Sequence, residues 1–139
     1  MSDENKAVMR RCLEEVWNKG NLTAMEEFYS NSTSLLDPLL PEVRGIDAVK
    51  NVVTMARTAW PDLHYTIDDL ISEGDKVVLR YTIRGTHKGE FLGMPATGKK
   101  FEATGTSTCR LTGGKIAETW VNWDALGMLK QLGMVTLPK

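Results

Sequence analysis

Along the first twenty residues, apolar side chains recur every three or four positions. They run from Val8 to Trp17 and form one stripe on a helix. Ser2 or Asp3 is a suitable first residue for this helix, and Gly20 is a suitable stop. The chain is therefore expected to begin with an amphipathic helix.

Two more helices are predicted before the period of the pattern changes. Thr23 and Glu26 have the spacing of a capping box, which favours a short second helix. The helical period returns at Ile46, and Pro61 ends it. Residues 30–45, between these two helices, are rich in Ser, Asn and Pro, so a loop with room for a short edge strand is expected there.

Beyond the third helix the period becomes two, which is typical of strands. Residues 63–71 and 76–87 flank the turn SEGD, and residues 101–111 and 115–123 flank the tight turn TGGK. This pattern predicts two hairpins and at least four antiparallel strands. One face of residues 76–87 is mostly polar and is expected to meet solvent, a polar cavity or a partner subunit.

No repeat, low-complexity tract or linker divides the chain, so residues 1–139 are predicted to form a single α+β domain. The N-terminal helices would pack on a strongly curved, mainly antiparallel sheet, and such a closed sheet leaves a cavity. The loop KGEFLGMPATGKK would lie at one end of the sheet. It lacks the spacing of a phosphate-binding loop and is interpreted as a lid or a dimer-edge loop.

The composition favours a globular protein of the cytoplasm. Of 139 residues, 42% are hydrophobic and 25% are charged, a balance typical of one domain. The apolar runs are shorter than the roughly 20 residues of a membrane span, and the start MSDENKAVMRR has no apolar core suited to a signal peptide. A net charge of -1 argues against nucleic acid as a partner, because phosphate binding needs a clustered positive field.

Cysteine usage gives no sign of a metal site or a disulfide framework. Cys12 and Cys109 are far apart and lie outside any Cys-x-x-Cys or Cys/His spacing. Both thiols are therefore expected to fill space in the core.

Five strings in the chain follow one another with a characteristic order and spacing. They are WNKGN, GIDAVK, WPDLHYTIDDLISEGDKVVLRYTIRGTH, KGEFLGMPATGKKF and GGKIAETWVNWDALGMLKQLG, and they run from about Val8 to Gly133. In this combination they resemble the SnoaL-like polyketide cyclase family, one of the nuclear-transport-factor-2-like cone folds. The resemblance implies a cone-shaped half-barrel, and it specifies the fold better than the reaction because one fold supports many activities.

The resemblance also implies a chemistry. The founding cyclases of this family close a ring by intramolecular aldol condensation of a polyketide methyl ester, using an acidic residue as general base and no metal or organic cofactor. A deep apolar cavity with one carboxylate at its bottom is implied, and Asp124 corresponds to that carboxylate. Arg110 stands where a histidine partner is expected, and arginine cannot shuttle a proton because it stays protonated.

Asp124 has two interpretations from the residues around it. A carboxylate in an apolar pocket, here near Trp120, has a raised pKa and removes a carbon-bound proton more readily. Aspartate is also a favoured helix N-cap, and the apolar pattern of residues 125–132 predicts a short helix directly after it. One aspartate at a strand end can serve both roles.

Strand alternation would bring further polar groups to the same wall as Asp124. It predicts one shared face for Ile116, Glu118, Trp120, Asn122 and Asp124. In the alternative interpretation, Glu118 pairs with a cation across the sheet and Asn122 satisfies a strand edge.

The remaining candidates are two histidines, an arginine and aromatic residues. His64 alternates with Tyr65, so only one of them can face a given side, and His87 lies at a strand exit from which a cavity mouth or a turn is within reach. Arg110 has the donor geometry to clamp a carbonyl or an anion. Trp17 and Trp120 are the tryptophans expected to reach the cavity and contact a hydrophobic or aromatic ligand.

Three functions remain open on these grounds. The first is a cofactor-free cyclase or isomerase in which Asp124 removes a proton and Asn122, His87 or Arg110 steadies an enolate oxygen. The second is a non-catalytic protein that binds a hydrophobic small molecule. The third is an epoxide or ester hydrolase built on Glu118, Asp124 and Arg110. In each case a homodimer or larger assembly through the outer face of the sheet is expected.

Overall fold

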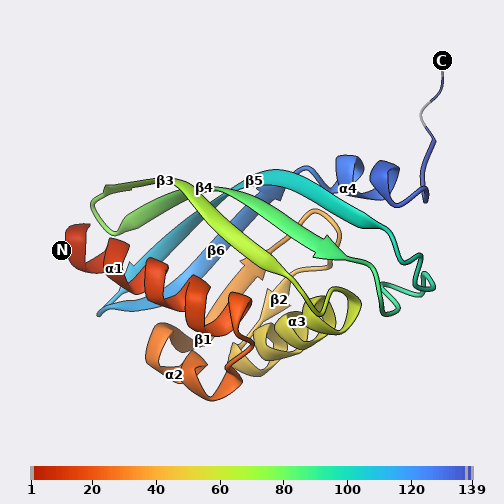
Figure 1. The fold of residues 1–139 in the computed structure, drawn as a ribbon. Helices are drawn as coiled ribbons and strands as arrows, with labels where there is room; N and C mark the ends of the chain where they lie inside the picture. Colours follow the sequence, from red (N-terminus) through yellow and green to blue (C-terminus); the bar gives the residue numbers. More distant parts are fainter. Residues whose placement is uncertain (1, 137, 139) are drawn as a thin grey trace.

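A computed structural model describes residues 2–136 and 138, which form helices packed against one curved sheet (Figure 1). The helical elements are α1 (Ser2–Cys12), the π-helix η1 (Leu13–Asn18), the 3-10 turn η2 (Leu22–Ala24), α2 (Met25–Phe28), α3 (Ile46–Ala59) and α4 (Ala125–Gln131). The strands are β1 (Tyr29–Leu36), β2 (Val43–Arg44), β3 (His64–Glu73), β4 (Lys76–Thr86), β5 (Lys100–Thr112) and β6 (Lys115–Trp123).

The six strands form a single open sheet with the order β2-β1-β6-β5-β4-β3. Strands β3 to β6 make the two predicted hairpins and pair antiparallel throughout. Strand β1 pairs parallel with β6, so the sheet is mixed. The predicted α+β fold, with helices on a curved and mainly antiparallel sheet, is confirmed.

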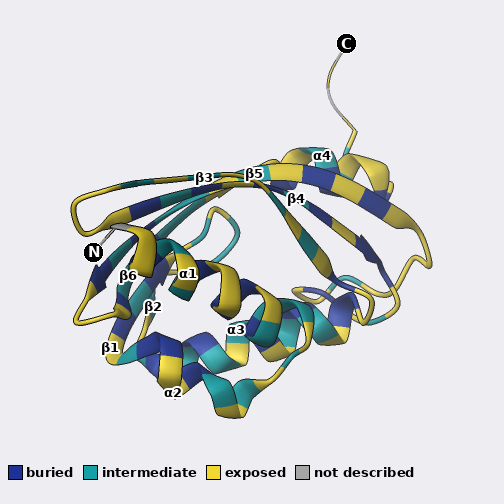
Figure 2. Ribbon diagram, turned by 60° about the vertical axis from the view of Figure 1, so that its left-hand side comes forward, coloured by how far each residue is buried: buried dark blue, intermediate teal, exposed yellow. Residues whose placement is uncertain are grey.

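Helices α1, α2 and α3 cover the concave face of the sheet, and most of the core lies between these two layers, whereas α4 packs beside β5 at the end of the sheet (Figure 2). Inward positions of β4 alternate with outward ones, so that Val77, Leu79, Tyr81 and Ile83 are buried. Helix α3 places Val49 and Val53 in the same core on one stripe. The outer face of the sheet is largely exposed.

The first helix continues past α1 as the π-helix η1, in which each turn holds an extra residue. The predicted helix therefore exists up to Asn18, but its last part is wound differently. The capping box predicted for the second helix is wrong: no side chain caps α2, and the Thr23 hydroxyl donates to the Asn21 side chain at 2.7 Å. Strand β1 occupies a segment expected to be mainly loop.

Register shifts interrupt three of the strand pairs, and the one in the β1–β6 pair lies between Tyr29 and Ser34. In β3 the register shifts between Ile67 and Asp69. In β6, Ile116 pairs with Leu111 of β5 and Glu118 pairs with Arg110, so Ala117 between them is an extra, bulged residue. The bulge at Ala117 decides which residues of β6 face the helices.

Candidate functional site

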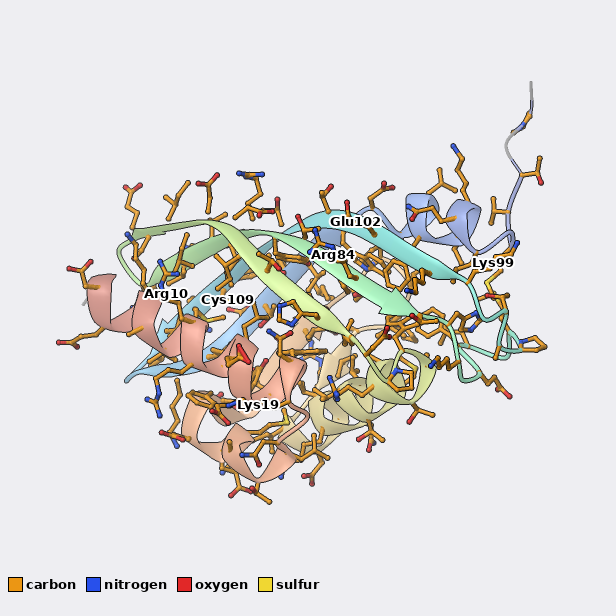
Figure 3. All side chains as sticks on the ribbon, in the orientation of Figure 1. Arg10, Lys19, Arg84, Lys99, Glu102 and Cys109 are labelled. Carbon is orange, nitrogen blue, oxygen red and sulfur yellow. The ribbon has the colours of Figure 1, made fainter. Side chains whose placement is uncertain are left out.

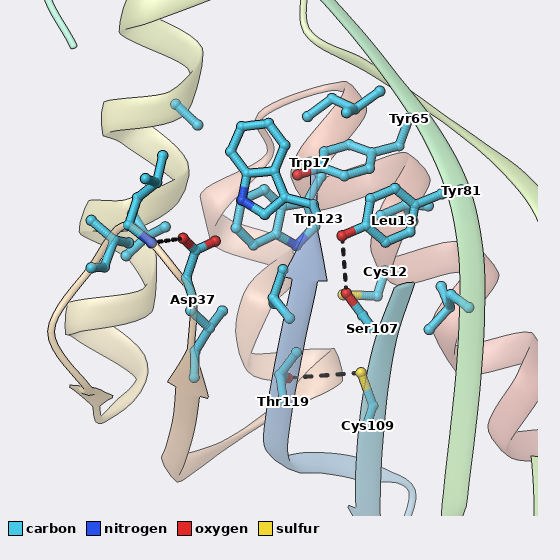
Figure 4. A pocket seen from close by; sticks show the side chains of 18 of the residues that line it. Cys12, Leu13, Trp17, Asp37, Tyr65, Tyr81, Ser107, Cys109, Thr119 and Trp123 are labelled. Atoms are coloured by element: carbon cyan, nitrogen blue, oxygen red, sulfur yellow. Dashed lines mark hydrogen bonds between the residues drawn. The ribbon is translucent and has the colours of Figure 1, made fainter. Parts of the chain in front are cut away.

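A cavity of ≈ 90 Å³ lies between the concave face of the sheet and the helices α1, η1 and α3 (Figure 4). One water needs only about 10–15 Å³ of such space, so several waters or a small organic group would fit. The lining is mostly apolar and comes from every layer of the fold, which is typical of a small-molecule site.

Aromatic rings form much of the cavity wall. Tyr65 of β3 packs edge-on against Tyr81 of β4, with ring centroids 5.1 Å apart, and against Trp17 of η1 at 6.0 Å. Trp60 packs against Phe91 at 4.7 Å and against Trp123 at 6.3 Å. These flat surfaces suit a ligand that contains rings.

Asp37 is the only carboxylate among the described residues that line the cavity. It follows the end of β1, and its Oδ1 accepts a hydrogen bond from the Leu39 amide at 2.9 Å. Burial raises the pKa of this carboxyl group, while hydrogen bonds from the Leu39 amide and the Trp123 side chain partly oppose the shift. A desolvated carboxylate with a raised pKa is a stronger proton acceptor near neutral pH.

The cavity tyrosines remain protonated far above neutral pH. Burial raises the pKa of Tyr81 to about 12, against a lowering hydrogen bond from Ser107. Burial also raises the pKa of Tyr65 well above its usual value, with the negative charge of Asp37 contributing. Both phenols are therefore hydrogen-bond donors at physiological pH.

Two thiols also line the cavity. Burial raises the pKa of both Cys12 and Cys109 to about 12, so neither is a thiolate at neutral pH. The Cys109 thiol lies 3.8 Å from the Thr119 hydroxyl. This state is consistent with the predicted role of both cysteines as fillers of the core.

Of the nine residues predicted to form the site, Trp17 and Tyr65 line the cavity. The expectation that Ile116, Glu118, Trp120, Asn122 and Asp124 share one face is wrong. Because Ala117 is bulged, the residues of β6 that line the cavity are Thr119, Val121 and Trp123. Glu118, Trp120 and Asn122 therefore lie on the opposite side of the strand.

Asp124 lies outside the cavity lining and is exposed. It is the N-cap of α4, and its Oδ1 accepts a hydrogen bond from the Gly127 amide at 2.9 Å. The sequence allows two roles for Asp124, a pocket carboxylate and a helix N-cap, and the structure contains the N-cap contact.

Arg110 and Glu118 form an ion pair on the outer face, with 2.6 Å between Nε and Oε1. The Arg110 guanidinium also donates to the Thr112 hydroxyl at 3.0 Å. A second pair, Arg84 and Glu102, lies on the same outer side toward the other end of β4 and β5 (Figure 3). Glu118, Asp124 and Arg110 thus do not meet at the cavity, which removes the trio on which the hydrolase hypothesis depended.

Neither histidine lines the cavity. His64 begins β3 and is exposed. His87 is fully buried directly after β4, where its Nδ1 accepts from the Thr97 amide at 3.3 Å and lies 3.1 Å from the Thr97 hydroxyl. The His87 backbone also bonds to Lys99 and Gly98, so this residue holds the base of the 88–99 loop.

Sequence reasoning missed Asp37, Tyr81 and Ser107 as site residues. Tyr81 lies on the face of β4 opposite the polar one, but nothing in the sequence distinguishes it from the other aromatic residues. Asp37 precedes Pro38 in a segment without periodicity, so only the three-dimensional path of the loop brings it to the cavity. Among the described residues there is no group of three or more side chains suited to holding a metal ion.

Within the described part of the chain, every helix is too short or too polar to cross a bilayer. The longest, α3, has 14 residues.

Comparison with known proteins gives consistent matches across the chain. A sequence model for SnoaL-like polyketide cyclases matches residues 7–132. The aklanonic acid methyl ester cyclase DnrD of Streptomyces peucetius is 31% identical over 128 residues, which cover 88% of this chain and 87% of DnrD. DauD of Streptomyces sp. (strain C5), with the same described activity, is also 31% identical over 128 residues, covering 88% of this chain and 78% of DauD.

The structure of TsrD from Streptomyces laurentii superposes on this fold with a TM-score of 0.85 and 28% sequence identity. The match covers 96% of this chain and 97% of TsrD. The likeness therefore extends over nearly the whole of both chains and includes the layers that enclose the cavity.

Proposed function

Because the chain belongs to the SnoaL-like polyketide cyclase family, we propose that it is a cofactor-independent cyclase or isomerase of a carbonyl-containing small molecule, with a cavity carboxylate as general base. The observation that carries the proposal is the partly buried carboxylate of Asp37, which lies among aromatic walls and is the one carboxylate in the described lining of the cavity. The relatives DnrD and DauD act on aklanonic acid methyl ester, which makes a polyketide ester the first substrate to try.

Asp37 is better placed than Asp124 for this role. A general base must reach the proton that it removes, within hydrogen-bond distance or through one water. Asp37 lines the cavity, whereas Asp124 is exposed and bonded to the Gly127 amide. Catalysis by Asp124, which the family resemblance implies, would require the start of α4 to move toward the cavity.

Two isosteric substitutions separate the two carboxylates. Asp37→Asn keeps an oxygen for the Leu39 amide but removes the base, so kcat for aklanonic acid methyl ester should fall by about 10²-fold or more. Asp124→Asn removes the charge but preserves the cap, because Asn and Asp cap helices about equally well, so helix α4 and turnover should both persist. Loss of turnover in Asp124→Asn alone would show that the base is Asp124 and not Asp37.

A non-catalytic binding protein is the second candidate. It is favoured by the absence of any histidine beside Asp37 among the described lining residues. Saturable binding of the ester without turnover by the unaltered protein would favour this candidate. The predicted homodimer through the outer face of the sheet stays a prediction, and sedimentation velocity of the purified chain would test it.

A further inference from the structure

The three tyrosines of the cavity differ in what their hydroxyl groups contact. The Tyr29 hydroxyl accepts a hydrogen bond from Trp17 Nε1 at 3.1 Å and donates to the Cys12 thiol. Both of its hydrogen-bonding functions are therefore engaged by the protein. This tyrosine closes the wall of the cavity and has no donor left for a ligand.

Tyr81 is engaged on one side only. The Ser107 hydroxyl donates to the Tyr81 oxygen at 3.2 Å. Because a phenol is both a donor and an acceptor, this contact fills an acceptor position and leaves the Tyr81 proton for another partner. Figure 4 shows the Tyr81 hydroxyl pointing into the space between the strands and the Asp37 loop.

Tyr65 reaches the same space from the neighbouring strand. Its ring lies edge-on to that of Tyr81, and Figure 4 shows both hydroxyl groups on the side of the rings that faces Asp37. The negative charge of Asp37 raises the pKa of both phenols, so the three groups are close enough to interact electrostatically. The cavity thus has two phenol donors on one side and one carboxylate acceptor on the other.

The position of Tyr65 is fixed from outside the cavity. The Asn18 side chain accepts from the Tyr65 amide at 2.7 Å and donates to the Tyr65 carbonyl at 3.1 Å. Asn18 is the last residue of the π-helix, and the Arg57 guanidinium donates to its carbonyl at 2.8 Å. Residues from η1 and α3 therefore hold the backbone of Tyr65 in place before any ligand arrives.

We propose that Tyr65 and Tyr81 form a donor site for the reacting oxygen of the substrate, opposite Asp37. The substrate class is an enolisable ketone or ester whose carbonyl oxygen lies between the two hydroxyls and whose rings pack on the tryptophans. Asp37 takes the proton from the carbon next to the carbonyl. The electron pair of the broken C–H bond forms the C=C bond of an enolate, and its oxygen accepts hydrogen bonds from the two phenols.

The chemistry of the donor site rests on the proposed function, but the binding of a small molecule to the two tyrosine hydroxyls can be measured without turnover. Phenol and toluene have nearly the same shape and differ in one hydroxyl group, so they are matched probes. The affinity of each is measured by titration of ¹H–¹⁵N NMR spectra of the full chain. Phenol is expected to bind the unaltered protein with shifts confined to the cavity.

Tyr65→Phe and Tyr81→Phe should each weaken phenol binding by about two- to tenfold and leave toluene binding unchanged, because each removes one hydrogen bond and no apolar surface. Tyr29→Phe is the matched control. Tyr29→Phe removes a hydroxyl group that is in the same cavity but already contacts two protein groups. The phenol affinity of this variant should therefore fall by less than that of Tyr65→Phe or Tyr81→Phe.

Two results would overturn the proposal: equal loss of phenol and toluene affinity, which indicates a structural role only, or no loss of phenol affinity in either variant. The assay also separates this proposal from the role of Asp37. If the selective loss of phenol is observed but Asp37→Asn still turns over the ester, the donor site stands and the general-base proposal fails. If turnover is lost in Asp37→Asn while neither tyrosine substitution changes phenol binding, the general-base proposal stands and the donor site fails.

Discussion

Gly105→Ala should destabilise the protein by crowding the cavity wall. Gly105 lies in β5 between Tyr81 on β4 and Trp123 on β6, and all three are in register. A Cβ at this position would lie 2.6 Å from Trp123 Cβ and 2.8 Å from Tyr81 Cε1. Both distances are shorter than a carbon–carbon contact of about 3.5–4.0 Å, so the Tyr81 ring and the segment of β6 that carries the Trp123 Cβ must both shift.

The size of the effect is a balance of two terms. Overpacking of a well-packed interior costs about 1–3 kcal/mol. Replacing glycine by alanine also lowers the conformational entropy of the unfolded chain, which stabilises the folded protein by about 0.4–1 kcal/mol. This gain applies here because Gly105 has no positive φ. The net loss should be about 1 kcal/mol or slightly more, which corresponds to a fall in Tm of about 3–5 °C for a domain of this size.

Thermal unfolding followed by circular dichroism measures this loss. Thr106→Ala, on the exposed side of the same strand, is the control and should change the free energy of unfolding by less than about 0.5 kcal/mol. Tyr81→Leu, which removes the ring atoms nearest to the added Cβ, should relieve part of the crowding, so the double variant should be more stable than the sum of the two single effects predicts. A Gly105→Ala protein as stable as the original would refute the rigid placement of Tyr81 and Trp123.

Two further outcomes are expected. Arg57→Ala should lower the free energy of unfolding by about 1.5–3 kcal/mol in urea titrations, because the guanidinium donates to the carbonyls of Trp17, Asn18 and Pro61 at 3.0, 2.8 and 3.2 Å; a loss below 0.5 kcal/mol would contradict this. The folded-state pKa of Asp37 is raised, so the native protein holds this proton more tightly than the unfolded chain, and stability should fall as pH rises from the usual carboxyl value through the raised one. Asp37→Asn should lack this decline, and identical pH profiles for the two proteins would disprove the shift.

The sequence was sufficient for the elements whose pattern is local. The helical stripe from Val8 to Trp17 and the two hairpins depend on periodicity and on short turns, and the structure contains all of them. Strand β1 was mostly missed because its polar run, Ser-Asn-Ser-Thr-Ser, has a weak alternation. Its parallel pairing with β6 joins segments more than 80 residues apart, and no local signal reports such a contact.

The candidate site was harder to predict, since a shift of one residue exchanges the two faces of a strand. The bulge at Ala117 causes that shift in β6 and takes Glu118, Trp120 and Asn122 away from the cavity. The family resemblance then led to Asp124, whereas the carboxylate in the cavity is Asp37, in a loop with no periodic pattern. Trp17 and Tyr65 do line the cavity, and their contact with a ligand stays a prediction.

The bulge at Ala117 also determines which of two sets of β6 side chains, offset by one residue, forms the cavity wall. With Ala117 bulged, the wall is made of Thr119, Val121 and Trp123, a surface without charge. Deletion of this one alanine would make Ile116 and Glu118 neighbours with the consecutive partners Leu111 and Arg110, so the bulge would disappear while the same three residues still faced the helices. Regular pairing of Ala117, without the bulge, would instead turn Glu118, Trp120 and Asn122 toward the helices. The neutral character of this wall therefore depends on the backbone conformation at one alanine, because pairing that absorbed the bulge would present an acidic wall with no substitution in the sequence.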